Sequence, residues 1–124
     1  MRRAILALAA VALLALRPHS PVFTDADAAH PIVVSAGEEF FIALPSNTTT
    51  GFAWTQSLAD AKVAAYEGNV YQPPSNPQPG AGGQQIFIYH ANRSGTTAIK
   101  LAYARPFEPA VLPAKVLTFF VTVR

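Results

Sequence analysis

Hydrophobic and polar side chains alternate along short segments of the chain from residue 32 onward, and turn residues separate these segments. In Glu38–Leu44, for example, Phe40, Ile42 and Leu44 face one side and the residues between them face the other. Seven segments are predicted as strands: Ile32–Ser35, Glu38–Pro45, Ala53–Leu58, Val63–Tyr71, Gln84–Ala91, Thr96–Ala104 and Ala114–Val123. Because no segment after residue 30 has a convincing helical period, we predict an all-β fold, an antiparallel β-sandwich of about seven or eight strands.

Two stretches of this pattern are interrupted or ambiguous. Pro45 is expected to end its strand, because proline has no N–H to donate to a ladder. Ala59–Ala65 fits a helical turn by composition, and its end fits a short strand equally well. Gln72–Gly83 holds four prolines and three glycines, which exclude a helix or a central strand there. A loop of this length inside a small domain is either functional or disordered.

Three unusual loops are predicted to lie at the same end of the sandwich. They cover residues 46–52, 72–83 and 105–113, which are the second, fourth and sixth connections between the predicted strands. Successive connections in a sandwich alternate between its two ends, so these three share one end. The sequence therefore predicts one composite surface made of three loops, as in antibody variable domains.

The N-terminus has the pattern of an export signal. Met1-Arg2-Arg3 precedes Ala4–Leu16, an unbroken run of thirteen apolar residues, whereas a bilayer span needs about 20. Ala26-Asp27-Ala28 fits a small-x-small cleavage site, so we assign residues 1–28 to a signal peptide and residues 29–124 to the domain. An earlier cut or an uncleaved anchor stays open, and Thr24–Pro31 has the composition of a leader or linker. After cleavage we expect a secreted or periplasmic protein with no membrane segment.

Charge and cysteine content exclude several function classes. The predicted domain keeps six basic residues (Lys62, Arg93, Lys100, Arg105, Lys115, Arg124) and five acidic ones (Glu38, Glu39, Asp60, Glu67, Glu108), a net charge of +1. It lacks the basic patch that nucleic-acid binding needs. Cysteine is absent, which excludes disulfides, a thiol nucleophile and a thiolate metal site. The domain must therefore rely on its hydrophobic core for stability.

The sequence offers no arrangement of catalytic groups. His90 alternates with Ile86 and Ile88 on a strand and has no carboxylate near it in sequence, so we interpret it as a structural residue. Glu38 and Glu39 are adjacent on a strand and point to opposite faces. A Ser-His-Asp order, a phosphate loop and metal-ligand spacing are all missing from the sequence. We therefore predict a protein that is not an enzyme and has no catalytic residue, no metal site and no cofactor.

The three loops carry residues suited to recognition. Asn47–Trp54 contains three consecutive threonines, a glycine and two aromatic residues; Trp54 is expected to plug the core, and the residues before it to form a binding tip. Gly80–Gly83 lets a backbone approach another backbone closely, as a loop entering a narrow cleft must. Phe107, in a loop stiffened by prolines, fits either core packing or an exposed anchor, and both readings stay open.

The chain resembles the chagasin family, whose members inhibit papain-like cysteine peptidases, in these same three places. Residues 47–54 are similar to its N-P-T-T-G-[YF]-x-W motif, Gly80–Gly83 to its G-x-G-G loop, and Arg105–Phe107 to its R-P-W loop. The resemblance covers roughly residues 32–123 and implies an immunoglobulin-like sandwich that occludes a peptidase cleft reversibly and without a covalent step. The implied contact residues are Asn47, Thr48, Thr49, Thr50, Gly51, Phe52, Gly80, Ala81, Gly82, Gly83, Arg105, Pro106 and Phe107. It further implies that residues 47–52 lie near the catalytic cysteine and histidine, 80–83 on the non-primed side and 105–107 on the primed side.

Two departures from the family pattern predict weaker or shifted specificity. Thr48 replaces the motif proline, which makes the first loop less pre-organised, and Phe107 replaces the usual tryptophan. Thr48 also turns Asn47-Thr48-Thr49 into a glycosylation sequon, and Asn92-Arg93-Ser94 is a second one. A glycan on Asn47 would block the surface, which favours a bacterial export route. The alternative function is an exported immunoglobulin-like binding or adhesion module, and in either case we expect a monomer.

Overall fold

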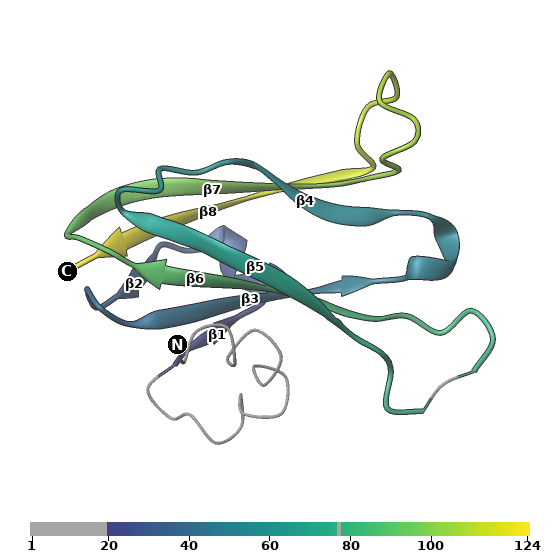
Figure 1. The fold of residues 1–124 in the computed structure, drawn as a ribbon, viewed down its shortest axis with the longest axis horizontal. Helices are drawn as coiled ribbons and strands as arrows, with labels where there is room; N and C mark the ends of the chain where they lie inside the picture. The colour runs from purple at the N-terminus through teal and green to yellow at the C-terminus, as the bar shows by residue number, and fades with distance from the viewer. Residues whose placement is uncertain (1–19, 77) are drawn as a thin grey trace.

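The computed structural model, which describes residues 20–76 and 78–124, has two four-stranded sheets that pack face to face (Figure 1). Sheet A contains, in spatial order, β1 (Val22–Phe23), β3 (Glu39–Ser46), β6 (Gly83–Ala91) and β5 (Ala64–Gln72). Sheet B contains β2 (Ile32–Val34), β8 (Lys115–Val123), β7 (Gly95–Ala104) and β4 (Ala53–Leu58). All pairs are antiparallel except the two short N-terminal strands, β1 on β3 and β2 on β8. The predicted all-β sandwich is therefore confirmed.

The core lies between the sheets and follows the alternation in the sequence. Alternate side chains of β3, β6, β7 and β8 point inward, and the following of them are buried apolar core residues: Phe40, Ile42, Leu44, Phe87, Tyr89, Ala91, Ile99, Leu101, Phe119, Val121 and Val123. Trp54 joins them from β4 with only 3% of its surface exposed, as predicted. A second buried apolar cluster, built from Phe41, Ala43, Ile86 and Ile88, lies on the other face of sheet A.

One local expectation is corrected, and one alternative that the sequence left open is resolved. Pro45 does not end its strand: β3 runs to Ser46, and Pro45 pairs with Gln84 of β6. Proline is tolerated there because β1 pairs only with Phe41 and Ile42, so the other edge of β3 is open at residue 45. Between Ala59 and Ala65, the chain makes a turn in which Val63 N–H and Ala64 N–H donate to the Asp60 carbonyl, and β5 then begins.

Residues 22–29 are part of the sandwich. β1 adds a parallel strand to β3, and the Phe23 ring packs edge-on against Phe40 with 6.2 Å between centroids. Asp25–Ala29 forms a 3-10 helix, η2, with Thr24 and Asp27 in a capping box. Thr24–Pro31, which the sequence predicts as a leader or linker, contains this helix, and Ala28 packs against the core. Residues 1–19, which hold most of the predicted signal peptide, lie outside the described residues, and the boundary at residue 28 stays a prediction.

The helical content of residues 20–76 and 78–124 is limited to short 3-10 turns such as η2, so none of their helices could cross a membrane. The three loops singled out in the sequence lie at one end of the sandwich, on the right of Figure 1, and the C-terminus lies at the other end. The predicted clustering of the loops is confirmed, and their contacts follow below.

Candidate functional site

The first loop is a short 3-10 turn, η3 (Thr48–Thr50), held by the side chain of Asn47. Asn47 Oδ1 accepts hydrogen bonds from Thr49 N–H at 3.1 Å and from Thr49 Oγ1 at 2.6 Å. Thr50 Oγ1 donates to the Asn47 carbonyl at 2.7 Å, and Gly51 N–H donates to the Thr48 carbonyl at 3.2 Å. Gly51 ends the turn with φ of 79°, a conformation that favours glycine. These bonds order the loop in place of the proline that Thr48 replaces.

The second loop is tied to the first by Asn47. Its Nδ2 donates to the Gly80 carbonyl at 2.8 Å. Gly80 belongs to a β-turn in which Ala81 N–H donates to the Gln78 carbonyl at 2.9 Å, with Pro79 and Gly80 at the central positions and φ of 80° at Gly80. At Gly82 a Cβ would lie 3.3 Å from the Ser46 carbonyl oxygen and 3.4 Å from Asn47 Cβ. A side chain at this position would therefore require Ser46 or Asn47 to shift by a few tenths of an ångström. The predicted close approach of this loop to a backbone in a narrow cleft stays a prediction.

Gly83 has a different position from its neighbours in the second loop. It is the first residue of β6 and pairs with Ser46 of β3. A Cβ on Gly83 would overlap the Gln72 carbonyl oxygen and would lie 2.8 Å from the Tyr71 hydroxyl oxygen. We therefore attribute this glycine to strand packing, whereas Gly80, Ala81 and Gly82 form the loop itself.

The third loop is stiffened by two consecutive turns. Glu108 N–H donates to the Arg105 carbonyl across Pro106-Phe107, and Val111 N–H donates to the Glu108 carbonyl across Pro109-Ala110. A proline at the second position of each turn presets its backbone angle. Arg105 Nη1 also lies 3.7 Å from Glu108 Oε1. The loop can therefore present its side chains with little conformational freedom.

Arg105 joins the third loop to the first. Its Nε donates to the Thr50 carbonyl at 3.1 Å, and its guanidinium carbon lies 4.5 Å from the centre of the Phe52 ring. Phe52 in turn stacks on Tyr103 with 5.2 Å between centroids. The hydroxyl of Tyr103 accepts from Asn47 N–H at 3.3 Å. All three loops are thus connected by specific contacts.

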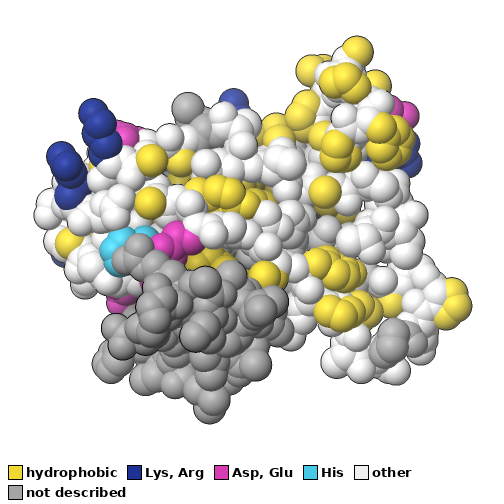
Figure 2. Space-filling view, in the orientation of Figure 1, with side chains coloured by type: hydrophobic (Ala, Val, Ile, Leu, Met, Phe, Trp, Pro, Cys, Tyr) yellow, Lys and Arg dark blue, Asp and Glu magenta, His cyan; other side chains and the backbone are white. Residues whose placement is uncertain are grey.

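Phe107 is an exposed residue and does not pack in the core. Its side chain is 69% exposed, which excludes the core-packing interpretation. Its role as a binding anchor stays a prediction. One edge of its ring lies over Gly51, where a Cβ would come within 3.1 Å of Phe107 Cε2. Val111 and Leu112 continue the apolar surface at 60% and 87% exposure. Figure 2 shows hydrophobic side chains gathered on the projecting third loop at the upper right.

Two residues that were not among the predicted site residues support the loops from below. Tyr103 lies under Phe52 and also contacts Trp54, with 4.9 Å between ring centroids. Gln85 is only 7% exposed, and its side chain bridges the two sheets. Its Oε1 accepts from Trp54 N–H at 2.9 Å and its Nε2 donates to the Trp54 carbonyl at 2.7 Å, as a paired strand would. A polar residue at the start of a buried apolar strand is the signal that could have identified Gln85.

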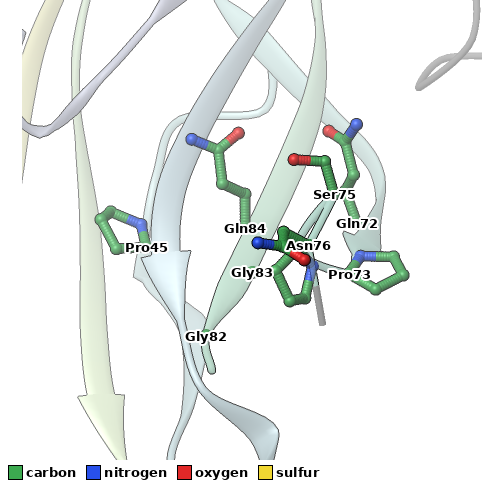
Figure 3. A pocket seen from close by; sticks show the side chains of 9 residues that line it. Pro45, Gln72, Pro73, Ser75, Asn76, Gly82, Gly83 and Gln84 are labelled. Atoms are coloured by element: carbon green, nitrogen blue, oxygen red, sulfur yellow. The ribbon is translucent and has the colours of Figure 1, made fainter. Parts of the chain in front are cut away.

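A hollow of about 550 Å³ lies at the base of the second loop (Figure 3). Its lining comes from three segments: Pro45 on β3, Gln72–Asn76 after β5, and Gly82–Gln84 at the start of β6. None of the described residues that line it is titratable. The described lining residues therefore supply no acid or base, and no activating base stands beside the Ser75 hydroxyl in this lining.

Ionisable groups are scarce on this end of the molecule. Within the described parts of the three loops, Arg105 and Glu108 are the ionisable side chains, and they pair with each other. The other polar groups are hydroxyls, side-chain amides and backbone groups. Such a surface binds through shape, apolar contact and hydrogen bonds. The fold and the site thus define a class of protein: an all-β domain that presents three connected loops for binding.

Comparison with known proteins gives the family. The chain matches the Chagasin family peptidase inhibitor I42 over residues 33–123, and it belongs to that family, whose members are inhibitors and not enzymes. It is 40% identical to chagasin from Trypanosoma cruzi over 81 residues, which cover 61% of this chain and 73% of chagasin.

Two solved structures have a similar fold. The cysteine protease inhibitor EhICP2 from Entamoeba histolytica superposes with a TM-score of 0.75 at 25% identity, over 87% of this chain and 100% of EhICP2. PbICP-C, solved in complex with falcipain-2, superposes with a TM-score of 0.59 at 17% identity, over 87% of this chain and 93% of PbICP-C. At this low identity the second likeness supports the shared sandwich alone.

Proposed function

We propose that this chain is a reversible, non-covalent inhibitor of papain-like cysteine peptidases, and that its three loops together close the active-site cleft. The observation that carries the proposal is the set of contacts that joins the loops, Asn47 to Gly80 and Arg105 to Thr50. The family to which the chain belongs supports the same function. The absence of a nucleophile from the loops fits inhibition by occlusion.

Each loop has a distinct role in this proposal. The tip at Thr48–Phe52 enters the cleft near the catalytic cysteine and histidine of the peptidase. The backbone of Gly80–Gly82 lies along the non-primed side, where the missing side chains allow close approach. Phe107 and its neighbours pack on the primed side as an apolar anchor. Because the loops are already ordered by internal contacts, little conformational entropy is lost on binding.

Inhibition of a panel of papain-like peptidases by the purified chain tests this proposal. We expect inhibition at or below micromolar concentrations, and a large loss of affinity in Gly82→Glu, because the new side chain would crowd Ser46 and Asn47 and add bulk and charge to the second loop. Ser94→Glu, which adds the same charge to an exposed turn at the opposite end, is the control and should inhibit as the wild type does. Failure of the wild-type chain to inhibit any peptidase of the panel would refute the proposal. If it then still captured one specific partner, the alternative of a binding or adhesion module would be favoured.

We also propose that the protein acts after export, as a secreted or periplasmic protein. The N-terminal charged and apolar pattern supports this location. Removal of residues 1–28 would delete β1 and the Phe23–Phe40 contact, so cleavage before Val22 would preserve the domain better. The intact mass of the exported protein identifies its N-terminal residue and so tests the cleavage position. A mature chain that begins at residue 29 would overturn cleavage before Val22.

A further inference from the structure

Three ligand-type side chains meet on the outer face of sheet A, far from the inhibitory loops. Glu39, Glu67 and His90 each place one carboxylate oxygen or imidazole nitrogen within 4.8 Å of the other two. Glu39 and His90 are direct partners in the β3–β6 ladder. Both alternate with inward core residues, Phe40 and Tyr89, and therefore project outward. They lie at the start of β3 and the end of β6, the end of the sandwich opposite the loops (Figure 1).

A β-bulge places the third member of this group. On β5, Tyr66 pairs with Tyr89 and Gly68 pairs with Ile88, so Glu67 is the extra residue of a bulge between these two pairs. A bulge bends its strand and redirects a side chain, and bulges are frequent beside functional sites. Here the extra residue brings the Glu67 carboxylate to His90. The three residues come from three adjacent strands and lie far apart in sequence, which is why residue spacing predicted no metal site.

The donor set suits a first-row transition metal. One imidazole nitrogen and two carboxylate oxygens are typical ligands of Zn²⁺, which binds them at about 2.0–2.2 Å, so that neighbouring ligand atoms lie roughly 3–4 Å apart. The three atoms of this group lie within 4.8 Å of one another, which is close to that spacing. Mg²⁺ and Ca²⁺ prefer oxygen ligands alone, so the histidine favours Zn²⁺ and its neighbours in the first row.

The histidine provides a second, independent observation. His90 Nδ1 is closed to solvent and has no hydrogen-bond partner. A buried polar atom without a hydrogen-bond partner is energetically unfavourable and needs an explanation. A bound ion is one of the common explanations. A metal ion would bind either Nδ1 itself or the other ring nitrogen, Nε2. Binding at either nitrogen would fix the orientation of the His90 imidazole ring.

We propose that Glu39, Glu67 and His90 form a binding site for a divalent transition-metal ion of the Zn²⁺ type on the outer face of sheet A. The ion links β3, β5 and β6 in a domain that has no cysteine and therefore no disulfide. Because the site lies at the end opposite the loops, it acts on the stability of the sandwich and is separate from peptidase binding.

Equilibrium dialysis of the full chain against ZnCl₂, together with thermal unfolding, tests the site. We expect one Zn²⁺ per chain and a melting temperature that rises by several degrees with Zn²⁺ and not with Mg²⁺. Glu67→Gln, which keeps the shape of the side chain, and His90→Ala should each lose at least tenfold in Zn²⁺ affinity and most of the thermal shift. His30→Ala removes an exposed histidine after η2 and is the matched control, which should keep both.

Two outcomes would overturn the proposal. One is the absence of Zn²⁺ binding to the wild-type chain at submillimolar concentrations. The other is binding that is equally strong in the wild type, Glu67→Gln and His90→Ala, which would place the ion elsewhere on the chain. Direct measurement of metal binding is preferred to an inhibition assay, because Zn²⁺ itself binds the thiolate of a cysteine peptidase.

Discussion

The side chain of Asn47 connects the first two loops: its Nδ2 donates to the Gly80 carbonyl oxygen at 2.8 Å. At the same time its Oδ1 accepts from the backbone and hydroxyl of Thr49, at 3.1 and 2.6 Å. One amide thus caps η3 and fixes the distance between two loops that are separated by about thirty residues of chain. It is also the group that would carry a glycan at the first sequon, so the proposed surface requires an unmodified Asn47.

We expect Asn47→Ala to weaken peptidase inhibition by roughly tenfold to thirtyfold. The change removes a cap and a loop-to-loop hydrogen bond, each of which contributes about 1 kcal/mol, and 1.4 kcal/mol corresponds to tenfold in affinity. The inhibition constant measures the effect. Asn92→Ala is the control, because Asn92 Nδ2 makes a similar bond to the Ala61 carbonyl in a turn at the opposite end. Equal losses in both variants would contradict a special role for Asn47.

Phe107→Ala is expected to reduce the affinity for the peptidase by tenfold or more and to leave thermal stability nearly unchanged. The ring is 69% exposed, so the folded domain gains little from it, whereas a rigid aromatic anchor is a typical hot spot. Phe120→Ala removes a ring of similar exposure, 58%, from the middle of β8 and should inhibit normally. Inhibition that is unaffected by Phe107→Ala would exclude the third loop from the contact.

The sandwich and the position of its loops could be predicted because they depend on local patterns. Period-two alternation marks the buried faces of β3, β6, β7 and β8, and proline and glycine mark the turns between them. Successive connections alternate between the two ends of a sandwich, so the second, fourth and sixth connections, which are the three loops, lie at one end. β1 is too short for alternation to be detected, and it forms because Phe23 packs on Phe40.

The contacts within the site could not be predicted, because they depend on register between strands. Gln85 reaches the backbone of Trp54 only when sheet A and sheet B have packed, and Glu67 reaches His90 only through the bulge in β5. The exposure of Phe107 depends on the two proline turns that hold the third loop away from the core. The residue types can be read from the chain, whereas the neighbours of each side chain depend on the tertiary structure.

Gln85→Leu should destabilise the domain strongly. The side-chain amide satisfies both the N–H and the carbonyl of Trp54 in a buried position, and leucine would leave both without partners at about 1–3 kcal/mol each. For a domain of this size we expect the melting temperature to fall by about 10 °C or more. Gln84→Leu, on the exposed face of the same strand, is the control and should melt within a few degrees of the wild type. If the melting temperature fell in Gln84→Leu and not in Gln85→Leu, the proposed role of Gln85 in supporting Trp54 would be refuted.

The phenol of Tyr89 should make the domain sensitive to alkali. Burial raises its pKa well above the ordinary value of about 10, and the charge of Tyr66 adds to the rise. Its hydroxyl also donates to Gln56 Oε1 at 2.6 Å, which links β6 to β4. Because the folded pKa lies above the unfolded one, the neutral phenol contributes its full stability below pH 10 and loses it as the pH rises further.

Denaturant unfolding between pH 7 and pH 12 measures this loss. Above pH 10 the wild-type free energy of unfolding should fall by up to about 1.4 kcal/mol per pH unit from this one group. Tyr89→Phe should be less stable at neutral pH, because it lacks the bond to Gln56, but its stability should fall less steeply above pH 10. Other groups that titrate in this range are present in both proteins and cancel in the difference between the two curves. Parallel curves for wild type and Tyr89→Phe would show that the Tyr89 phenol does not control alkaline unfolding.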